Sequence, residues 1–183
     1  MRKLALFSFV AAVSAACSGS PASPEFVVPL TTSAVKSGEP LSTTHMSGAH
    51  ETPARDTVAQ GQAIMKFAAD GQSVSYKLIA SNIDNVVASH IHQGTVDQAG
   101  PPVVFLFGPA PANGGRHNGV LAEGTIRSEN LINGLKGQPI SALIAMIQRG
   151  EAYANIHTDD GVLPANSGPG DFAAGEIRGQ VRK

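Results

Sequence analysis

Three histidines are the residues of this chain whose spacing points most directly to chemistry. His90 and His92 occur in Ser-His-Ile-His-Gln-Gly at 89–94, and His157 occurs in Asn-Ile-His-Thr at 155–158. Because side chains alternate on a β-strand, His90 and His92 would lie on one face. A third imidazole from a later strand would complete a nitrogen-rich metal site, which suits copper and zinc. The alternative is a structural role, in which the imidazoles hydrogen-bond to backbone or water.

Further candidate residues lie near these motifs. His50, in a Gly-Ala-His-Glu segment, is a candidate fourth ligand or else an exposed loop histidine. Glu51 and Glu176 are candidates to accept the second ring N–H of a ligating histidine, and a salt bridge to an arginine is the simpler role for Glu176. Arg178 alternates with Glu176 on a predicted strand. It would either hold that polar face together or present positive charge to an anionic substrate.

Four aspartates in predicted loops form the other group that could bind a metal: Asp97, Asp159, Asp160 and Asp171. A calcium site is one option, but EF-hand spacing is missing, so solvated loop charge is the expectation. The sequence contains no Gly-X-Ser-X-Gly elbow, and its single cysteine lies near the N-terminus. These patterns give no support to nucleophilic catalysis.

The elements that must position these residues are predicted to be β-strands. Only 5% of the 183 residues are aromatic, whereas the chain has 20 glycines and 12 prolines, which favours short strands joined by many turns. Ile140, Leu143, Ile144 and Ile147 are spaced as one face of a helix, which predicts a short helix at 140–148. We therefore expect an all-β antiparallel sandwich with one short helix. Its strands are predicted at 41–47, 59–67, 73–80, 86–92, 103–107, 121–126, 153–157 and 176–181, and long loops at 108–119 and 158–174.

The first forty residues are predicted to lie outside the folded domain, which would comprise residues 41–183. Residues 1–17 combine a basic start, an apolar run and small residues before a cysteine, which is typical of a secretory signal peptide. Cys17 resembles the lipidated cysteine of a bacterial lipoprotein, whose lipid would attach the chain to a membrane; otherwise cleavage would fall near Ala15 or Ala16. Residues 18–40 are predicted to be a flexible linker.

Localisation and charge narrow the classes of partner. The predicted signal peptide indicates an exported protein of the bacterial cell envelope, which would be lipid-anchored, periplasmic or extracellular. The net charge of −1 gives no indication of a nucleic-acid partner. A metal ion is the partner that the histidines predict, and the sequence identifies no protein partner.

Five blocks of the chain resemble the CHRD domain, in the order expected for that family. They are Ser-Gly-Ala-His-Glu-Thr-Pro at 47–53, His-Ile-His-Gln-Gly at 90–94, Gly-Pro-Pro-Val-Val at 100–104, Ala-Tyr-Ala-Asn-Ile-His-Thr at 152–158 and Gly-Glu-Ile-Arg-Gly-Gln-Val at 175–181. The resemblance implies an immunoglobulin-like β-sandwich and little about activity. The connection from His157 to Gly175 is longer than the family pattern implies.

The His-Ile-His-Gln segment is also similar, over a few residues, to the copper-binding strand of copper–zinc superoxide dismutase, a β-sandwich enzyme. That likeness implies copper ligation by His90, His92 and His157, with Arg178 attracting the anion. The dense zinc-binding loop and the disulfide of that enzyme are not evident in this sequence. Since each imidazole must lose its proton to ligate, binding is predicted to weaken below about pH 6.

The leading hypothesis is an exported copper-binding protein with superoxide dismutase-like activity, with zinc as the second choice of metal. The first alternative is a non-enzymatic adhesion or matrix-interaction module of the cell envelope, in which the histidines would be structural. The second alternative is a protein for metal storage or delivery, against which the absence of methionine clusters argues.

Overall fold

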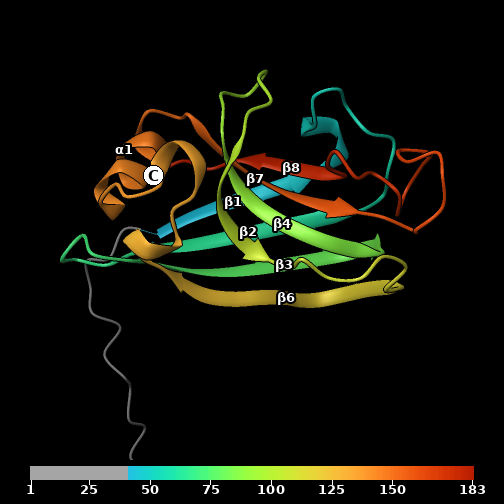
Figure 1. Ribbon diagram of the computed structural model, residues 1–183, viewed down its shortest axis with the longest axis horizontal. Coiled ribbons are helices and arrows are strands. Elements are labelled where there is room, and N and C mark those ends of the chain that lie inside the picture. Colours follow the sequence, from blue (N-terminus) through green and yellow to red (C-terminus); the bar gives the residue numbers. More distant parts are fainter. Residues whose placement is uncertain (1–40) are drawn as a thin grey trace, which may run out of the picture. The chain divides into compact units, whose positions relative to one another are not determined.

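The computed structural model describes residues 41–183, which form one curled antiparallel sheet and one α-helix (Figure 1). The predicted signal peptide at 1–17, its Cys17 and the predicted linker at 18–40 lie outside the described residues. Within 41–183, no helix combines the length and the apolar character needed to cross a membrane.

The sheet contains eight strands in the order β5-β4-β7-β8-β1-β2-β3-β6. Every neighbouring pair is antiparallel. The Tyr76 hydroxyl on β3 donates a hydrogen bond of 2.7 Å to the Leu106 carbonyl on β5, which links the two halves of the sheet. The predicted all-β fold is confirmed, in the form of one barrel-like sheet. Its strands are β1 (Leu41–Ser47), β2 (Gln60–Phe67), β3 (Val74–Asp84), β4 (Val86–Gln93), β5 (Pro102–Phe107), β6 (Arg116–Ile126), β7 (Ala152–Thr158) and β8 (Ile177–Gln180).

The inner face of the curled sheet holds the hydrophobic core. Met65 and Phe67 of β2 are buried there, as are Ile91 of β4, Ile156 of β7 and Ile177 of β8. Because side chains alternate along a strand, the residues on either side of these isoleucines point to the outer face. The histidines and the arginine of the motifs are therefore placed on the outside of β4, β7 and β8.

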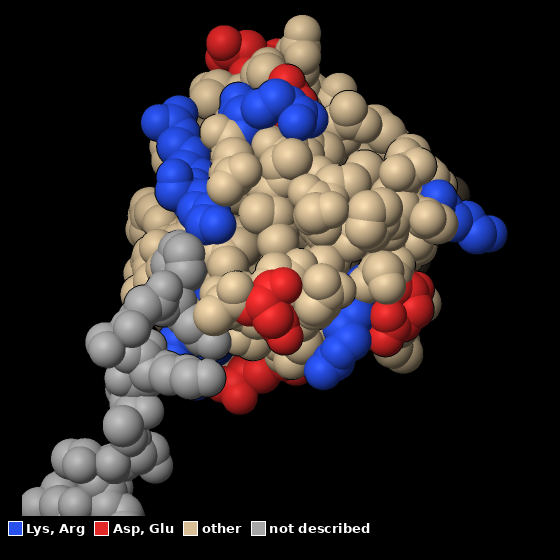
Figure 2. All heavy atoms as spheres, turned by 90° about the vertical axis from the view of Figure 1, so that its left-hand side faces the viewer, with Lys and Arg blue, Asp and Glu red and all other residues tan. Residues whose placement is uncertain are grey.

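The predicted helix is present with the expected bounds, as α1 (Ile140–Gln148). Its residues Ile140, Leu143, Met146 and Ile147 are buried in the core, and α1 lies at one end of the sheet (Figure 1). Figure 2 views that end of the molecule, where charged side chains of both signs surround a mainly uncharged centre. Three short 3-10 helices complete the described elements: η1 (Gly48–His50), η2 (Ser128–Asn130) and η3 (Asn133–Leu135).

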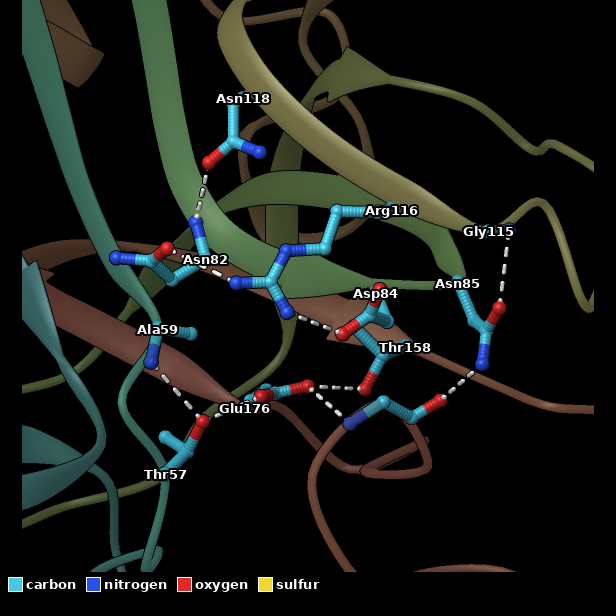
Figure 3. Close-up of polar contacts among 11 residues, drawn as sticks. Thr57, Ala59, Asn82, Asp84, Asn85, Gly115, Arg116, Asn118, Thr158 and Glu176 are labelled. Atoms are coloured by element: carbon cyan, nitrogen blue, oxygen red, sulfur yellow. Dashed lines mark hydrogen bonds and ion pairs between the residues drawn. The ribbon is translucent and has the colours of Figure 1, made fainter.

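The first predicted long loop is shorter than expected, because β6 begins at Arg116 and not at residue 121. The Arg116 guanidinium contacts the Asp84 carboxylate at 3.2 Å and donates to Asn82 Oδ1 at 2.9 Å (Figure 3). These polar contacts hold the ends of β3 and β6 together. The Gly- and Asn-rich sequence there has no apolar alternation, so the pattern could not predict this part of the strand.

Candidate metal centre

A layer of polar side chains covers the outer face of β4, β7 and β8. In the strand register, His90 lies opposite Asn155, and His92 lies opposite Tyr153. On the other side of β7, Asn155 lies opposite Arg178. Loops after β1, after β4 and before β8 close over this layer, since their residues contact its side chains.

The three predicted ligands converge in this layer. His90, His92 and His157 each offer a ring nitrogen, and these nitrogens all lie within 4.8 Å of one another. His90 Nδ1 and His157 Nε2 are 3.0 Å apart. His92 is only 7% exposed, and its ring centroid lies 5.3 Å from that of His90. The expectation that two same-face histidines of one strand meet a third from a later strand is met.

Two backbone carbonyls indicate which ring nitrogen carries the proton in two of these imidazoles. His92 Nδ1 donates to the Gly100 carbonyl at 2.7 Å, and His157 Nδ1 donates to the Ala173 carbonyl at 3.0 Å. In the neutral ring, Nε2 is then the atom with the free lone pair. His157 Nε2 accepts from His90 Nδ1, whereas His92 Nε2 is buried without a hydrogen-bond partner in the described part of the chain. A metal ion would satisfy that lone pair.

Burial keeps the imidazoles neutral. Desolvation, with the neighbouring His157 and His92 adding to it, lowers the pKa of His90 to about 4. Desolvation also lowers the pKa of His92 to about 4, against the opposing effect of its hydrogen bond to Gly100. The pKa of His157 is lowered by burial as well. Since neutral imidazole is the form that ligates metals, the group is suited to metal binding at neutral pH.

Glu176 lies away from the histidine rings and has a structural role. Its carboxylate accepts hydrogen bonds from Thr57 Oγ1 at 2.6 Å, Thr158 Oγ1 at 2.7 Å and the Gly170 amide at 2.9 Å (Figure 3). It therefore joins the start of β8 to the end of β7 and to two loops. A salt bridge of Glu176 with Arg178 or with Arg55, the two predicted partners, is not among the ion pairs of residues 41–183.

Glu51 lies beside Asn155 in the polar layer. A Cβ atom on Gly175 would come within 2.6 Å of Glu51 Oε1 and 2.9 Å of Asn155 Nδ2, so only glycine lets the loop close over this pair. Burial raises the pKa of Glu51 to about 7, although the Arg178 charge opposes the shift. Backbone carbonyls, and not the predicted carboxylates, accept the ring N–H groups. The Gly100 carbonyl accepts from His92 Nδ1, and the Ala173 carbonyl accepts from His157 Nδ1.

Arg178 is separated from the histidines by Tyr153. Its Cζ atom lies 3.4 Å from the Tyr153 ring centroid, and His92 stacks on the same ring at 5.0 Å. Since β4 and β8 flank β7 on opposite sides, the tyrosine lies between the two side chains. Arg178 Nη2 donates to the Thr95 and Gln98 carbonyls at 2.6 and 3.0 Å, and Arg178 is 2% exposed. Of its two predicted roles, the geometry favours holding the polar face and its covering loop together.

His50 is not part of the histidine group. It is exposed on η1 and lines a cavity of about 230 Å³ together with His45, Arg178 and Arg182. The alternative expectation of an exposed loop histidine fits this position better than that of a fourth ligand.

Four contributors to the site were not predicted from the sequence. Tyr153 and Asn155 precede His157 by four and two positions on the same strand face, so the alternation that identified the histidines could also have identified them. Gly100 and Ala173 act through their carbonyl oxygens. Backbone acceptors in loops leave no signal in side-chain patterns.

A protein-family model described as the CHRD domain matches residues 42–181, a range that includes the histidine group and the loops over it. No curated protein and no solved structure matches the chain. The local likeness to copper–zinc superoxide dismutase thus stays a prediction.

Proposed function

The chain belongs to the CHRD domain family, and from that premise we propose that this member binds copper through His90, His92 and His157. The observation that carries the proposal is the buried, unpartnered Nε2 of His92 beside the paired rings of the other two histidines. Imidazole nitrogens suit copper and zinc, and copper is the more strongly bound of the two at such sites. Three protein ligands leave a coordination position open for a small molecule.

The hydrogen bond between His90 and His157 marks where the metal would bind. A metal that binds through His90 Nδ1 and His157 Nε2 needs a lone pair on each of these atoms, so the His90 proton would sit on Nε2 in the metal-bound form. Because burial already keeps all three rings neutral, binding at neutral pH would release no proton from them.

Superoxide dismutation is the activity that this proposal predicts, because bound copper would supply one-electron redox chemistry. We assign Arg178 a structural role in this proposal, because its Nη2 donates to two loop carbonyls and Tyr153 separates it from the histidines. Substrate would have to approach through the partly exposed His90 and His157. A copper-loaded protein without dismutase activity would support storage or delivery instead.

The proposal includes export to the bacterial cell envelope. Its support is the sequence of residues 1–17, with Cys17 as the lipidated residue. Mass spectrometry of the native protein should find an N-terminal Cys17 with lipid attached, and Cys17→Ser should release the protein from membranes. An unmodified N-terminus near Ala16 would support export without an anchor.

The test of copper binding compares two double variants. His90→Ala/His92→Ala removes two proposed ligands, and His45→Ala/His50→Ala removes two exposed histidines as a matched control. Competition titration of Cu²⁺ against a chelator of known affinity should show a loss of at least 100-fold for the first variant and no change for the control. Elemental analysis of protein purified from its native envelope should find about one copper per chain. Equal affinity in all three proteins would contradict the proposal and favour the adhesion module.

A further inference from the structure

The loop between β7 and β8 gathers three of the four aspartates that the sequence suggested to be solvated charges. Asp159, Asp160 and Asp171 each offer a carboxylate oxygen, and these oxygens lie within 4.8 Å of one another. Asp97 is not in this group. Three carboxylates so close repel one another unless a cation lies between them.

Two of the three carboxylates accept a hydrogen bond from a backbone amide, each through one of its two oxygens. Asp159 Oδ1 accepts the Gly161 amide at 2.7 Å, and Asp160 Oδ1 accepts the Val162 amide at 2.8 Å. Each bond closes a turn within the loop. The second oxygen of each carboxylate has no protein donor within residues 41–183 and is free to bind a cation.

Asp171 supplies the independent observation that points to a ligand. Its Oδ2 accepts from both the amide and the hydroxyl of Ser167, at 2.8 and 2.7 Å. The residue is only 2% exposed, and its Oδ1 has no hydrogen-bond partner in the described chain. A buried carboxylate oxygen without a donor is costly unless a cation satisfies it.

We propose that Asp159, Asp160 and Asp171 bind a calcium ion, at a site distinct from the histidine group. Carboxylate oxygens are ligands for hard cations. Calcium takes several carboxylates at once, whereas magnesium keeps several waters and is bound through one or two carboxylates, so a group of three favours calcium. Three carboxylates with water or carbonyl oxygens indicate an affinity of about 10⁻⁴–10⁻³ M, which is typical of extracellular modules.

The bound ion would hold a loop that orients the histidine group. The same loop provides the Ala173 carbonyl to His157 and the Gly170 amide to Glu176. Calcium binding is therefore expected to raise the thermal stability of the chain. It does not need the histidines, so it should persist in His90→Ala/His92→Ala.

The test uses substitutions that remove charge but keep the turns. Asp159→Asn/Asp160→Asn retains the Oδ1 acceptor at both positions. Asp70→Asn is the matched control, since Asp70 Oδ1 accepts the Gln72 amide at 2.9 Å in an equivalent exposed turn far from the group. Calorimetric titration with CaCl₂, and melting temperatures with CaCl₂ or with a chelator, measure the effect.

Wild type and Asp70→Asn should bind calcium with millimolar or tighter affinity and melt at a higher temperature with it. The Asp159→Asn/Asp160→Asn variant should bind at least tenfold more weakly, and magnesium should bind wild type more weakly than calcium. Absence of calcium binding by wild type, or an equal affinity of the double variant and the control, would overturn the proposal. Loss of calcium binding in His90→Ala/His92→Ala would also overturn it.

Discussion

The histidine group and the aspartate group are connected by the loop between β7 and β8, and they are built in opposite ways. His90, His92 and His157 lie on strands of the sheet, and burial keeps their rings neutral. Asp159, Asp160 and Asp171 lie on the loop itself and use half of their oxygens to shape it.

The difference shows how a scaffold selects a metal. The strands hold a small number of neutral imidazole nitrogens in fixed positions, and such ligands suit copper or zinc. A loop closed by its own aspartates presents charged oxygens at adjustable spacing, which suits calcium. Glu176 lies between the two groups, because it binds Thr158, which directly follows His157 and precedes Asp159.

The strongest disruption of both groups is expected from Glu176→Gln. The buried carboxylate accepts three hydrogen bonds, and an amide would turn an NH₂ toward donors that need an acceptor. We expect the free energy of unfolding to fall by about 3 kcal/mol, with weaker binding of both metals. Urea denaturation of wild type, Glu176→Gln and the exposed control Glu129→Gln measures this. A loss no larger than that of the control would show that Glu176 does not join the two groups.

The histidine group alone should respond to Gly100→Ala. The new Cβ would lie 1.9 Å from the Gln93 carbonyl oxygen, so the loop must move and take with it the carbonyl that accepts from His92. Loss of such an orienting acceptor lowers metal affinity by about 10–100-fold. Copper titration should show this loss while calcium titration stays unchanged. Gly114→Ala, whose Cβ would meet nothing nearer than 3.9 Å, is the control.

Acidification should separate the two groups further. Because the pKa of His92 is about 4 in the fold and about 6.5 in the unfolded chain, the unfolded chain binds more protons between these values. The metal-free protein should therefore lose stability as the pH falls from 6.5 to 4, by about 1–2 kcal/mol from His92. Urea unfolding of wild type and His92→Gln at pH 7 and pH 4.5 tests this. The free energy of unfolding of wild type should fall between the two pH values by more than that of the variant, because only wild type loses the contribution of His92.

Copper binding should follow the same lowered pKa values. Retention is expected down to about pH 5, below the onset near pH 6 that unperturbed imidazoles would give. Copper release between pH 7 and 6, followed by chelator competition, would show that burial does not protect the ligands.

The smallest effect is expected from Glu51→Gln. The pKa of Glu51 is about 7 in the fold, above its usual value, so the folded chain binds more protons and wild type loses stability as the pH rises through 7. The variant should be more stable than wild type at pH 8, by about 1 kcal/mol or less because the side chain is partly solvated, and closer to it at pH 5. A variant less stable than wild type at pH 8 would indicate that the Glu51 charge supports Arg178.

Local pattern in the sequence was enough to predict the histidine pair and the helix. Alternation places His90 and His92 on one face and Ile91 in the core, and the spacing from Ile140 to Ile147 determines the buried side of α1. These features depend on the geometry of consecutive residues, which is the same in any fold.

Only the tertiary structure decided which groups meet. The strand order puts β7 between β4 and β8, so that His157 joins the histidines while Tyr153 separates Arg178 from them. Loop closure brings Asp171 to Asp159 and Asp160, and it directs Glu176 to threonines and not to an arginine. Strand order and loop closure arise from packing between residues far apart in the chain. A pattern of neighbouring residues therefore does not predict them.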